Sequence, residues 1–181
     1  MKVYKRRKEM LSQKMIDRIN LQINREMYSA YLYLAMAARM NEAGYTGIGK
    51  WLTVQYHEEM FHAMKFAKYL HDQNATVAYT KIDTPEFKEK DVKSLFQHVL
   101  AHEQGVTASI REIMELAVAE KDYATQALAQ WYINEQIEEE KNDTEILQNI
   151  DMLGNSAQGL FMLNIELGKR DPSVPLDFNK I

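Results

Sequence analysis

The sequence predicts an all-α fold: a four-helix bundle with one long crossover connection between helices 2 and 3, and a short fifth helix near the C-terminal end. Three observations support this prediction. The 181 residues include only 7 Gly and 3 Pro, and this scarcity of helix breakers favours long helices. Four long segments carry apolar residues at alternating spacings of three and four, which is the period of one helix face. The segment 74–91 has no such period, and its length suits a crossover that joins two helices pointing the same way.

The first two predicted helices flank a short connection that contains glycine. The first begins near Ser12 and Asp17 and extends to about Met40, and the second covers roughly 48–73. The expected buried stripe of the first helix is Ile16, Ile19, Ile23, Glu26, Ala30, Tyr33 and Ala37. That of the second helix is Leu52, Tyr56, Glu59, Ala63, Phe66 and Leu70. Each stripe therefore places one carboxylate on an otherwise apolar face.

The remaining helices follow the crossover. We expect them at about 91–121, 124–153 and 157–167. The expected stripe of the third helix is Leu95, Val99, Glu103, Val106, Ile110, Met114 and Ala117. That of the fourth helix is Leu128, Tyr132, Gln136, Glu139, Asp143, Ile146, Ile150 and Leu153. Three successive positions of this last stripe are polar.

We divide the chain into a basic N-terminal extension at 1–11, a bundle domain at 12–169 and a C-terminal tail at 170–181. A domain of this size can bury a sizeable core without disulfides or structural metals. The extension is expected to be a solvated segment that leads into the first helix, with an anion-binding arm as the alternative.

Charge and composition restrict the function and the compartment. The formal net charge is −4, and the first ten residues carry +4, so the rest of the chain carries −8. An acidic body suits attracting cations better than binding nucleic acid. The basic start is not followed by the apolar segment that a secretory signal requires. No apolar run has the roughly eighteen residues of a membrane span, so we expect a cytoplasmic protein. With no Cys, thiolate metal sites and cysteine nucleophiles are excluded.

The carboxylates on the buried stripes form a repeated pattern. Glu59 and His62 are three residues apart, so their side chains share one helix face and can meet one cation. Taken alone, such a pair is common on protein surfaces. The spacing of 33 residues between Glu26 and Glu59 recurs in the second helix pair, between Glu103 and Gln136. Each helix pair thus places an acid at mid-length and a two-ligand pair on the following helix.

This pattern predicts a dinuclear metal site. Unpaired carboxylates in one core repel each other, so they must share protons or hold cations. The stripes contain no Lys or Arg, which disfavours structural ion pairs as the alternative. Carboxylate and imidazole ligands suit an iron or manganese ion better than they suit the zinc ion of a closed structural site. A metalloprotease motif is excluded because Phe61 stands where a second His would have to follow His57.

The motifs around these residues closely resemble those of the bacterial non-haem ferritins, over essentially the whole chain. The matching segments are Asn-Arg-Glu-Met-Tyr-Ser-Ala at 24–30, His-Glu-Glu-Met-Phe-His at 57–62, His-Glu-Gln at 102–104 and Gln-Trp-Tyr-Ile-Asn-Glu-Gln-Ile-Glu-Glu-Glu-Lys at 130–141. The resemblance implies a homo-oligomeric shell of twenty-four subunits. Such shells oxidise Fe(II) with O2 or H2O2 at a diiron ferroxidase centre and store the product as a ferric mineral.

The resemblance also implies a role for each matching residue. The first iron would be held by Glu26, Glu59 and His62. The second would be held by Glu59 as a bridge, Glu103 and Glu139, with Gln136 beside it. A third iron site nearby would be formed by Glu58, Glu135, Glu138 and Glu139. The alternative is that Glu58, Glu135, Glu138 and Glu140 form only a solvated acidic face. Because an imidazole binds metal only when neutral, we expect acid near pH 5 to weaken the site through His62.

Tyr33 matches a tyrosine that lies near the centre in the family, where it supplies an electron or limits radical damage. A core tyrosine with a bonded hydroxyl is the alternative for this residue.

Neighbouring classes of protein share parts of this pattern. The haem-containing bacterioferritins carry a second Glu-x-x-His on the fourth helix, whereas this chain has Gln-Ile-Glu-Glu at 136–139, so no haem is expected. The mini-ferritins that shield DNA build their site between subunits and lack a fifth helix. A passive iron-buffer shell subunit with little catalysis is a competing function for the same fold. We expect no nucleic-acid partner and no membrane partner.

Overall fold

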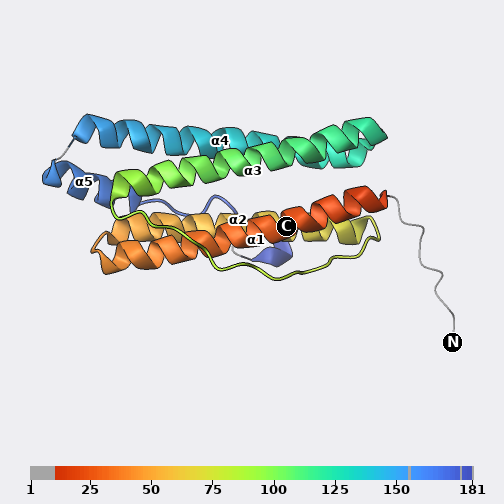
Figure 1. Ribbon diagram of the computed structural model, residues 1–181, viewed down its shortest axis with the longest axis horizontal. Helices are drawn as coiled ribbons and strands as arrows, with labels where there is room; N and C mark the ends of the chain where they lie inside the picture. The colour runs from red at the N-terminus through yellow and green to blue at the C-terminus, as the bar shows by residue number, and fades with distance from the viewer. Residues whose placement is uncertain (1–10, 155, 176, 181) are drawn as a thin grey trace.

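The computed structural model describes residues 11–154, 156–175 and 177–180, and within these ranges the regular structure is entirely helical (Figure 1). The elements are α1 (Gln13–Glu42), α2 (Thr46–Asp72), α3 (Val92–Glu120), α4 (Tyr123–Leu153), α5 (Ala157–Leu167) and the 3-10 helix η1 (Phe178–Lys180). The predicted all-α fold is confirmed, and the predicted helix ends agree with the observed ones to within about two residues. Of the basic extension, residues 1–10 lie outside the described ranges, and Leu11 is buried in the core.

Side chains that cap the helices explain where several of them begin. The Ser12 hydroxyl accepts a hydrogen bond from the Met15 amide at 3.1 Å, at the start of α1. The Asp91 and Asp122 carboxylates do the same for α3 and α4. Each cap satisfies an amide that has no partner inside its helix, which is typically worth about 1 kcal/mol.

The helices form two antiparallel pairs, α1 with α2 and α3 with α4 (Figure 1). Residues 75–90, which contain no helix or strand, run the length of the bundle outside α1 and return the chain to the end where α2 began. The α2 and α3 helices therefore point the same way, as predicted. Two α1 side chains hold this crossover: Asn20 bonds the Thr76 carbonyl at 3.0 Å and the Ala78 amide at 2.7 Å, and Asn24 donates to the Lys81 carbonyl at 3.0 Å.

The apolar core is divided into two clusters along the bundle axis. One cluster contains Ile19 and Ile23 of α1 with Phe66 of α2, and the other contains Met36 of α1 with Leu52 of α2. The predicted stripe residues lie in these clusters or between them, and those that are only partly buried are Tyr56, Met114, Leu128 and Leu153. The gap between the clusters falls at mid-length of all four long helices, where each stripe carries its polar residues. Of the helices in the described ranges, none has the length and apolar character needed to cross a membrane.

The α5 helix docks against the start of α2 at a glycine. A Cβ atom added to Gly47 would lie 1.8 Å from the backbone oxygen of Asn164, far inside van der Waals contact. The Asn164 side chain also accepts a hydrogen bond from the Ile48 amide at 3.0 Å. Close backbone approach at Gly47 thus sets the position of α5 and of the chain that follows it.

We expect Gly47→Ala to displace α5 and to destabilise the protein by about 1–3 kcal/mol, because the methyl group has no room. The matched control is Gly105→Ala on α3, where an added Cβ meets nothing within 4 Å. That control should stabilise its helix by about 0.5–1 kcal/mol. Urea unfolding and amide hydrogen exchange of α5 measure both effects. Unchanged exchange of α5 in Gly47→Ala would contradict the close contact.

Candidate metal centre

Three predicted ligands from α1 and α2 meet in the gap between the core clusters. One ligand atom each from Glu26, Glu59 and His62 lies within 4.8 Å of the others, and all three residues are buried. Among the described residues, Glu26 Oε2, both Glu59 oxygens and His62 Nε2 have no hydrogen-bond partner. Buried polar atoms without partners are costly and rare, and these four are available to coordinate a cation. Carboxylate oxygens with one imidazole suit a divalent first-row metal such as iron, so the donor set fits the predicted cation.

The predicted ligands of α3 and α4 are buried beside this group but are linked by hydrogen bonds. The Tyr33 hydroxyl donates to Glu103 Oε1, and the Gln136 amide donates to Glu103 Oε2 at 3.4 Å. On α4, Glu139 accepts a hydrogen bond from the Gln55 amide at 3.0 Å. Tyr33 therefore has a bonded hydroxyl and also lies next to the centre, so both interpretations of this residue are compatible with its position.

Burial and mutual repulsion make this centre hold protons when metal is absent. Burial raises the pKa of Glu59 well above its usual range, and the charges of Glu103 and Glu26 raise it further. Burial likewise raises the pKa of Glu103, with the charge of Glu139 as the next cause. The pKa of Glu139 is raised to about 7, first by burial and then by Glu58. A cation that binds these carboxylates therefore competes with protons.

His62 behaves differently from our expectation. Burial, together with the charge of Lys65, lowers the pKa of His62 to about 4. The imidazole thus stays neutral and able to bind metal at pH 5, and our expectation that it becomes charged there is wrong. Its Nδ1 lies 3.8 Å from Glu59 Oε2, one helical turn away. Any weakening of the site near pH 5 has to come from the carboxylates.

A second layer of polar residues orients Glu26. The Gln22 amide donates to Glu26 Oε1 at 2.8 Å, and Gln22 Oε1 accepts from Ser109 and, at 3.3 Å, from Arg18. Arg18 also donates to the Ser109 carbonyl at 2.5 Å and pairs with Glu112 at 3.0 Å. Gln22 was not among the predicted site residues, although its position one turn before Glu26 on the same helix was a usable signal.

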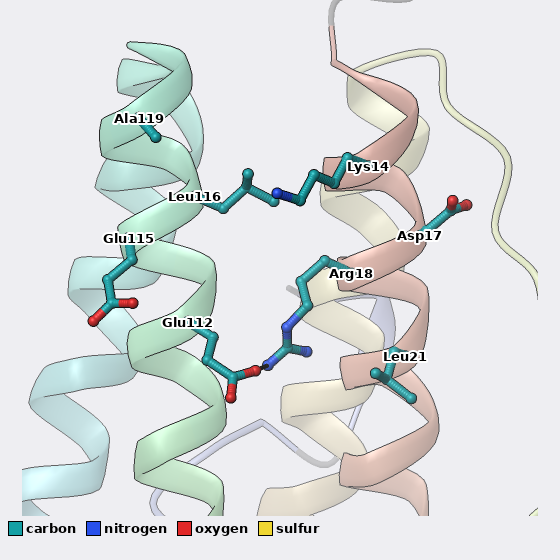
Figure 2. Close-up of a pocket in the computed structure, with 8 residues that line it drawn as sticks. All are labelled: Lys14, Asp17, Arg18, Leu21, Glu112, Glu115, Leu116 and Ala119. Atoms are coloured by element: carbon teal, nitrogen blue, oxygen red, sulfur yellow. Dashed lines mark hydrogen bonds and ion pairs between the residues drawn. The ribbon is translucent and has the colours of Figure 1, made fainter.

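Arg18 connects this layer to a groove on the outside of the bundle. Figure 2 shows the Arg18 side chain of α1 reaching across to Glu112 of α3, with Glu115 further along the same helix. The lining residues are Lys14, Asp17, Arg18, Leu21, Glu112, Glu115, Leu116 and Ala119. None of the predicted ligands lines this groove, so it is separate from the candidate centre.

The residues proposed for a third ion differ in burial, and Glu58 is not part of a solvated face. Glu58 is buried, and its carboxylate accepts hydrogen bonds from Arg170 Nη2 at 2.5 Å and from the Ser173 hydroxyl at 2.7 Å. The solvated alternative is therefore wrong for Glu58. Glu138 is exposed and Glu135 is partly buried on α4, and burial followed by the charges of Glu138 and Glu58 raises the pKa of Glu135. The C-terminal tail thus contacts a predicted ligand, which our sequence analysis missed.

Asp143 is a further buried acid to which our sequence analysis gave no role. It lies one turn after Glu139 on α4, and neither of its oxygens has a hydrogen-bond partner among the described residues. Burial raises its pKa to about 8, the charge of Glu139 adds to this, and that of Arg170 opposes it. Asp143 is therefore protonated at neutral pH in the metal-free protein.

We expect Asp143→Asn to gain stability relative to the wild type as the pH rises from 5 to 8. The folded state keeps the Asp143 proton up to about pH 8, whereas the unfolded chain releases it near pH 4, so the wild type loses stability across this window. Asparagine does not titrate, and the difference between the two proteins should change by more than about 1 kcal/mol. Urea unfolding of metal-free protein at both pH values measures it. The exposed Asp83→Asn serves as control, and a constant difference between Asp143→Asn and wild type would contradict the raised pKa.

Comparison with known proteins agrees with this arrangement. Residues 16–153 match the family model described as a ferritin-like domain. A probable bacterial non-heme ferritin-like protein of Haemophilus influenzae is 36% identical over 159 residues, covering 88% of this chain and 96% of the relative. A bacterial non-heme ferritin of Staphylococcus haemolyticus is 32% identical over 161 residues, covering 89% of this chain and 97% of the relative.

Solved structures agree as well. An open-pore ferritin from the hyperthermophilic archaeon Archaeoglobus fulgidus superposes with a TM-score of 0.87 at 38% identity, covering 89% of this chain and 98% of that one. A humanized archaeal ferritin superposes with a TM-score of 0.89 at 37% identity, covering 91% of this chain and 99% of that one. The match covers the helices that carry all the predicted ligands. On sequence and on structure, this chain belongs to the ferritin family.

Proposed function

We propose that the chain is the subunit of a cytoplasmic iron store with ferroxidase activity. Two Fe(II) ions are its substrates at the mid-bundle centre. Glu26, Glu59 and His62 hold the first ion, and Glu59 bridges to the second. The other ligands of the second ion are Glu103 and Glu139, with Gln136 beside them. Each Fe(II) gives up one electron, so two ions reduce one O2 to H2O2, or one H2O2 to two waters, and either reaction takes up two protons.

The cluster of buried donor atoms without partners on Glu26, Glu59 and His62 carries this proposal. When iron binds, the buried carboxylates stabilise it, because their negative charge offsets the positive charge that grows as Fe(II) becomes Fe(III). The protons held by Glu59, Glu103 and Glu139 leave when iron binds. The neutral His62 needs no such exchange and is ready as a ligand.

The neighbouring residues complete the proposed centre. Tyr33, hydrogen-bonded to Glu103, is placed to supply an electron or to limit radical damage at the second ion. A third ion is proposed at Glu58, Glu135, Glu138 and Glu139. The pair of Glu135 and Glu138 supports this, because residues three apart share a face of α4.

Replacing Glu59 by Gln should slow Fe(II) oxidation at least about tenfold, because the bridge between the two ions is lost. Metal-free protein is loaded with Fe(II) without air, and the ferric absorbance is followed after O2 or H2O2 is added. The control is Glu115→Gln, the same change at an exposed acid of the outer groove, which should match the wild type. Equal rates for Glu59→Gln and wild type would favour a passive iron-buffer shell instead.

Assembly into a shell of twenty-four subunits is the second part of the proposal. Exposed apolar side chains support it, since contiguous ones mark protein interfaces. Phe161, Met162 and Ile165 are exposed on α5, and Tyr31 and Leu34 are exposed on α1. An enclosed shell provides the space in which ferric mineral collects.

Mass measurement in solution tests this assembly directly. Light scattering coupled to size exclusion should give a particle of about twenty-four chains of 21.1 kDa each. Substituting Phe161 and Ile165 by Asp should break the particle into smaller oligomers while the helical content stays unchanged. A monomer or dimer of the unmodified chain would contradict the shell.

A further inference from the structure

The chain turns back after α5 and runs along α2 (Figure 1). The four residues Arg170–Ser173 of this stretch reach Glu58, next to the candidate centre. We call them the return segment. Glu58 is buried, and within the described part of the chain its hydrogen-bond donors come from this segment. Oε2 accepts from Arg170 Nη2 at 2.5 Å, and Oε1 accepts from the Ser173 amide at 3.2 Å and from its hydroxyl at 2.7 Å. Both oxygens of this carboxylate are therefore occupied.

Arg170 is held in place by more than Glu58. Its guanidinium lies over the ring of Trp51, with Cζ 4.9 Å from the ring centre. Its Nη1 donates to the Gln55 side-chain carbonyl. Because the Gln55 carbonyl faces Arg170, the Gln55 NH2 group must face the other way, and it donates to Glu139 Oε2 at 3.0 Å. The return segment thus touches Glu58 directly and sets the orientation of the amide that bonds Glu139.

A guanidinium and a metal ion satisfy a buried carboxylate in the same way, by supplying positive charge. Two of the four residues proposed for the third ion, Glu58 and Glu139, are engaged by Arg170 directly or through Gln55. Oε1 already accepts two hydrogen bonds from Ser173, and the Arg170 guanidinium places a positive charge 2.5 Å from Oε2, so a cation that binds Glu58 must displace Ser173 or come close to a like charge. The third ion and the docked segment therefore need the same atoms.

We propose that the return segment and the third iron ion are alternative occupants of Glu58, so that Arg170 and Ser173 undock when that ion binds. The inference rests on the proposed function, because it concerns the third ion of the same centre. Arg170 acts as a positioning residue. With the segment docked, the charge of Glu58 is compensated by Arg170, and the Glu139 carboxylate is hydrogen-bonded to Gln55. With the segment released, Glu58 becomes available to metal and the chain after α5 is freed from α2.

Zinc binding to the metal-free protein tests this competition, with Zn(II) as a probe that does not change oxidation state. Arg170→Gln and Ser173→Ala should each bind the third Zn(II) more tightly, by about tenfold for Arg170→Gln. Apparent affinity rises with the fraction of protein in the binding-competent state, and each substitution raises that fraction by undocking the segment. The matched control is Lys169→Gln, which removes the same charge one residue earlier, where Lys169 pairs with the exposed Glu166 at 2.6 Å. Titration calorimetry gives the number of ions and their affinities.

A second measurement separates displacement from a simple change of charge. Amide hydrogen exchange of the wild-type return segment should rise at least about tenfold on saturation with Zn(II), since an undocked segment loses its protection. Glu58→Gln should show weakened third-ion binding and fast exchange of the segment without metal. If Arg170→Gln tightens zinc binding but wild-type exchange is unaffected by zinc, charge alone is at work and the inference is wrong. Identical zinc affinities for Arg170→Gln, Ser173→Ala, Lys169→Gln and wild type would overturn it as well.

Failure of the proposed function gives a different result. If Glu59→Gln binds as much Zn(II) as the wild type, the proposed dinuclear centre is wrong, whatever the result at Glu58. If Glu59→Gln loses two Zn(II) ions while the Arg170 and Ser173 variants bind zinc with wild-type affinity, the dinuclear centre is supported and the competition at Glu58 is wrong. If no variant binds a third ion, the competition is excluded.

Discussion

The carboxylates buried in the middle of the bundle determine which protons, hydrogen bonds and charges the surrounding residues must supply. Each of the four long helices brings at least one acid or amide into the gap between two apolar clusters, and water does not reach them. Such groups are tolerated only when protons, hydrogen bonds or cations compensate for the lost hydration. In the metal-free protein the compensation comes from raised pKa values, from the Tyr33 and Gln136 hydrogen bonds to Glu103, and from Arg170 at Glu58.

The compensation differs from one acid to the next. Glu103 and Glu139 are hydrogen-bonded, Glu58 is ion-paired, and Glu59 and Asp143 have no hydrogen-bond partner in the described part of the chain. The groups without partners have the most to gain from a cation. In the proposed centre, Glu59 would exchange protons for metal, while Gln22 and Gln55 hold the neighbouring carboxylates of Glu26 and Glu139 by hydrogen bonds.

Helical periodicity explains how much of this could be predicted from sequence. Residues three and four apart share a helix face whatever the rest of the chain does, so the stripes and the pairing of Glu59 with His62 followed from local rules. The crossover was predicted from the length of its segment, and the approach of Glu26 from another helix was expected from the resemblance to the ferritins. The contact between Arg170 and Glu58 joins residues 112 positions apart and depends on how α5 docks at Gly47, which no local pattern encodes. The lowered pKa of His62 likewise depends on burial by the assembled helices, including Tyr132 of α4, whose ring centre lies 5.7 Å away.

The division of the core along the bundle axis also bears on how chain length can vary. One residue added within α2, between its start and Glu59, would turn the acid about 100° around the helix axis and move it out of the gap. Glu59 would then point into an apolar cluster or into solvent, and His62 would follow it. Residues 75–90 have no such register to keep, because they cross the outside of α1 without periodic structure. Insertions and deletions should therefore be tolerated in the crossover and selected against within the helices, at any distance from the ligands themselves.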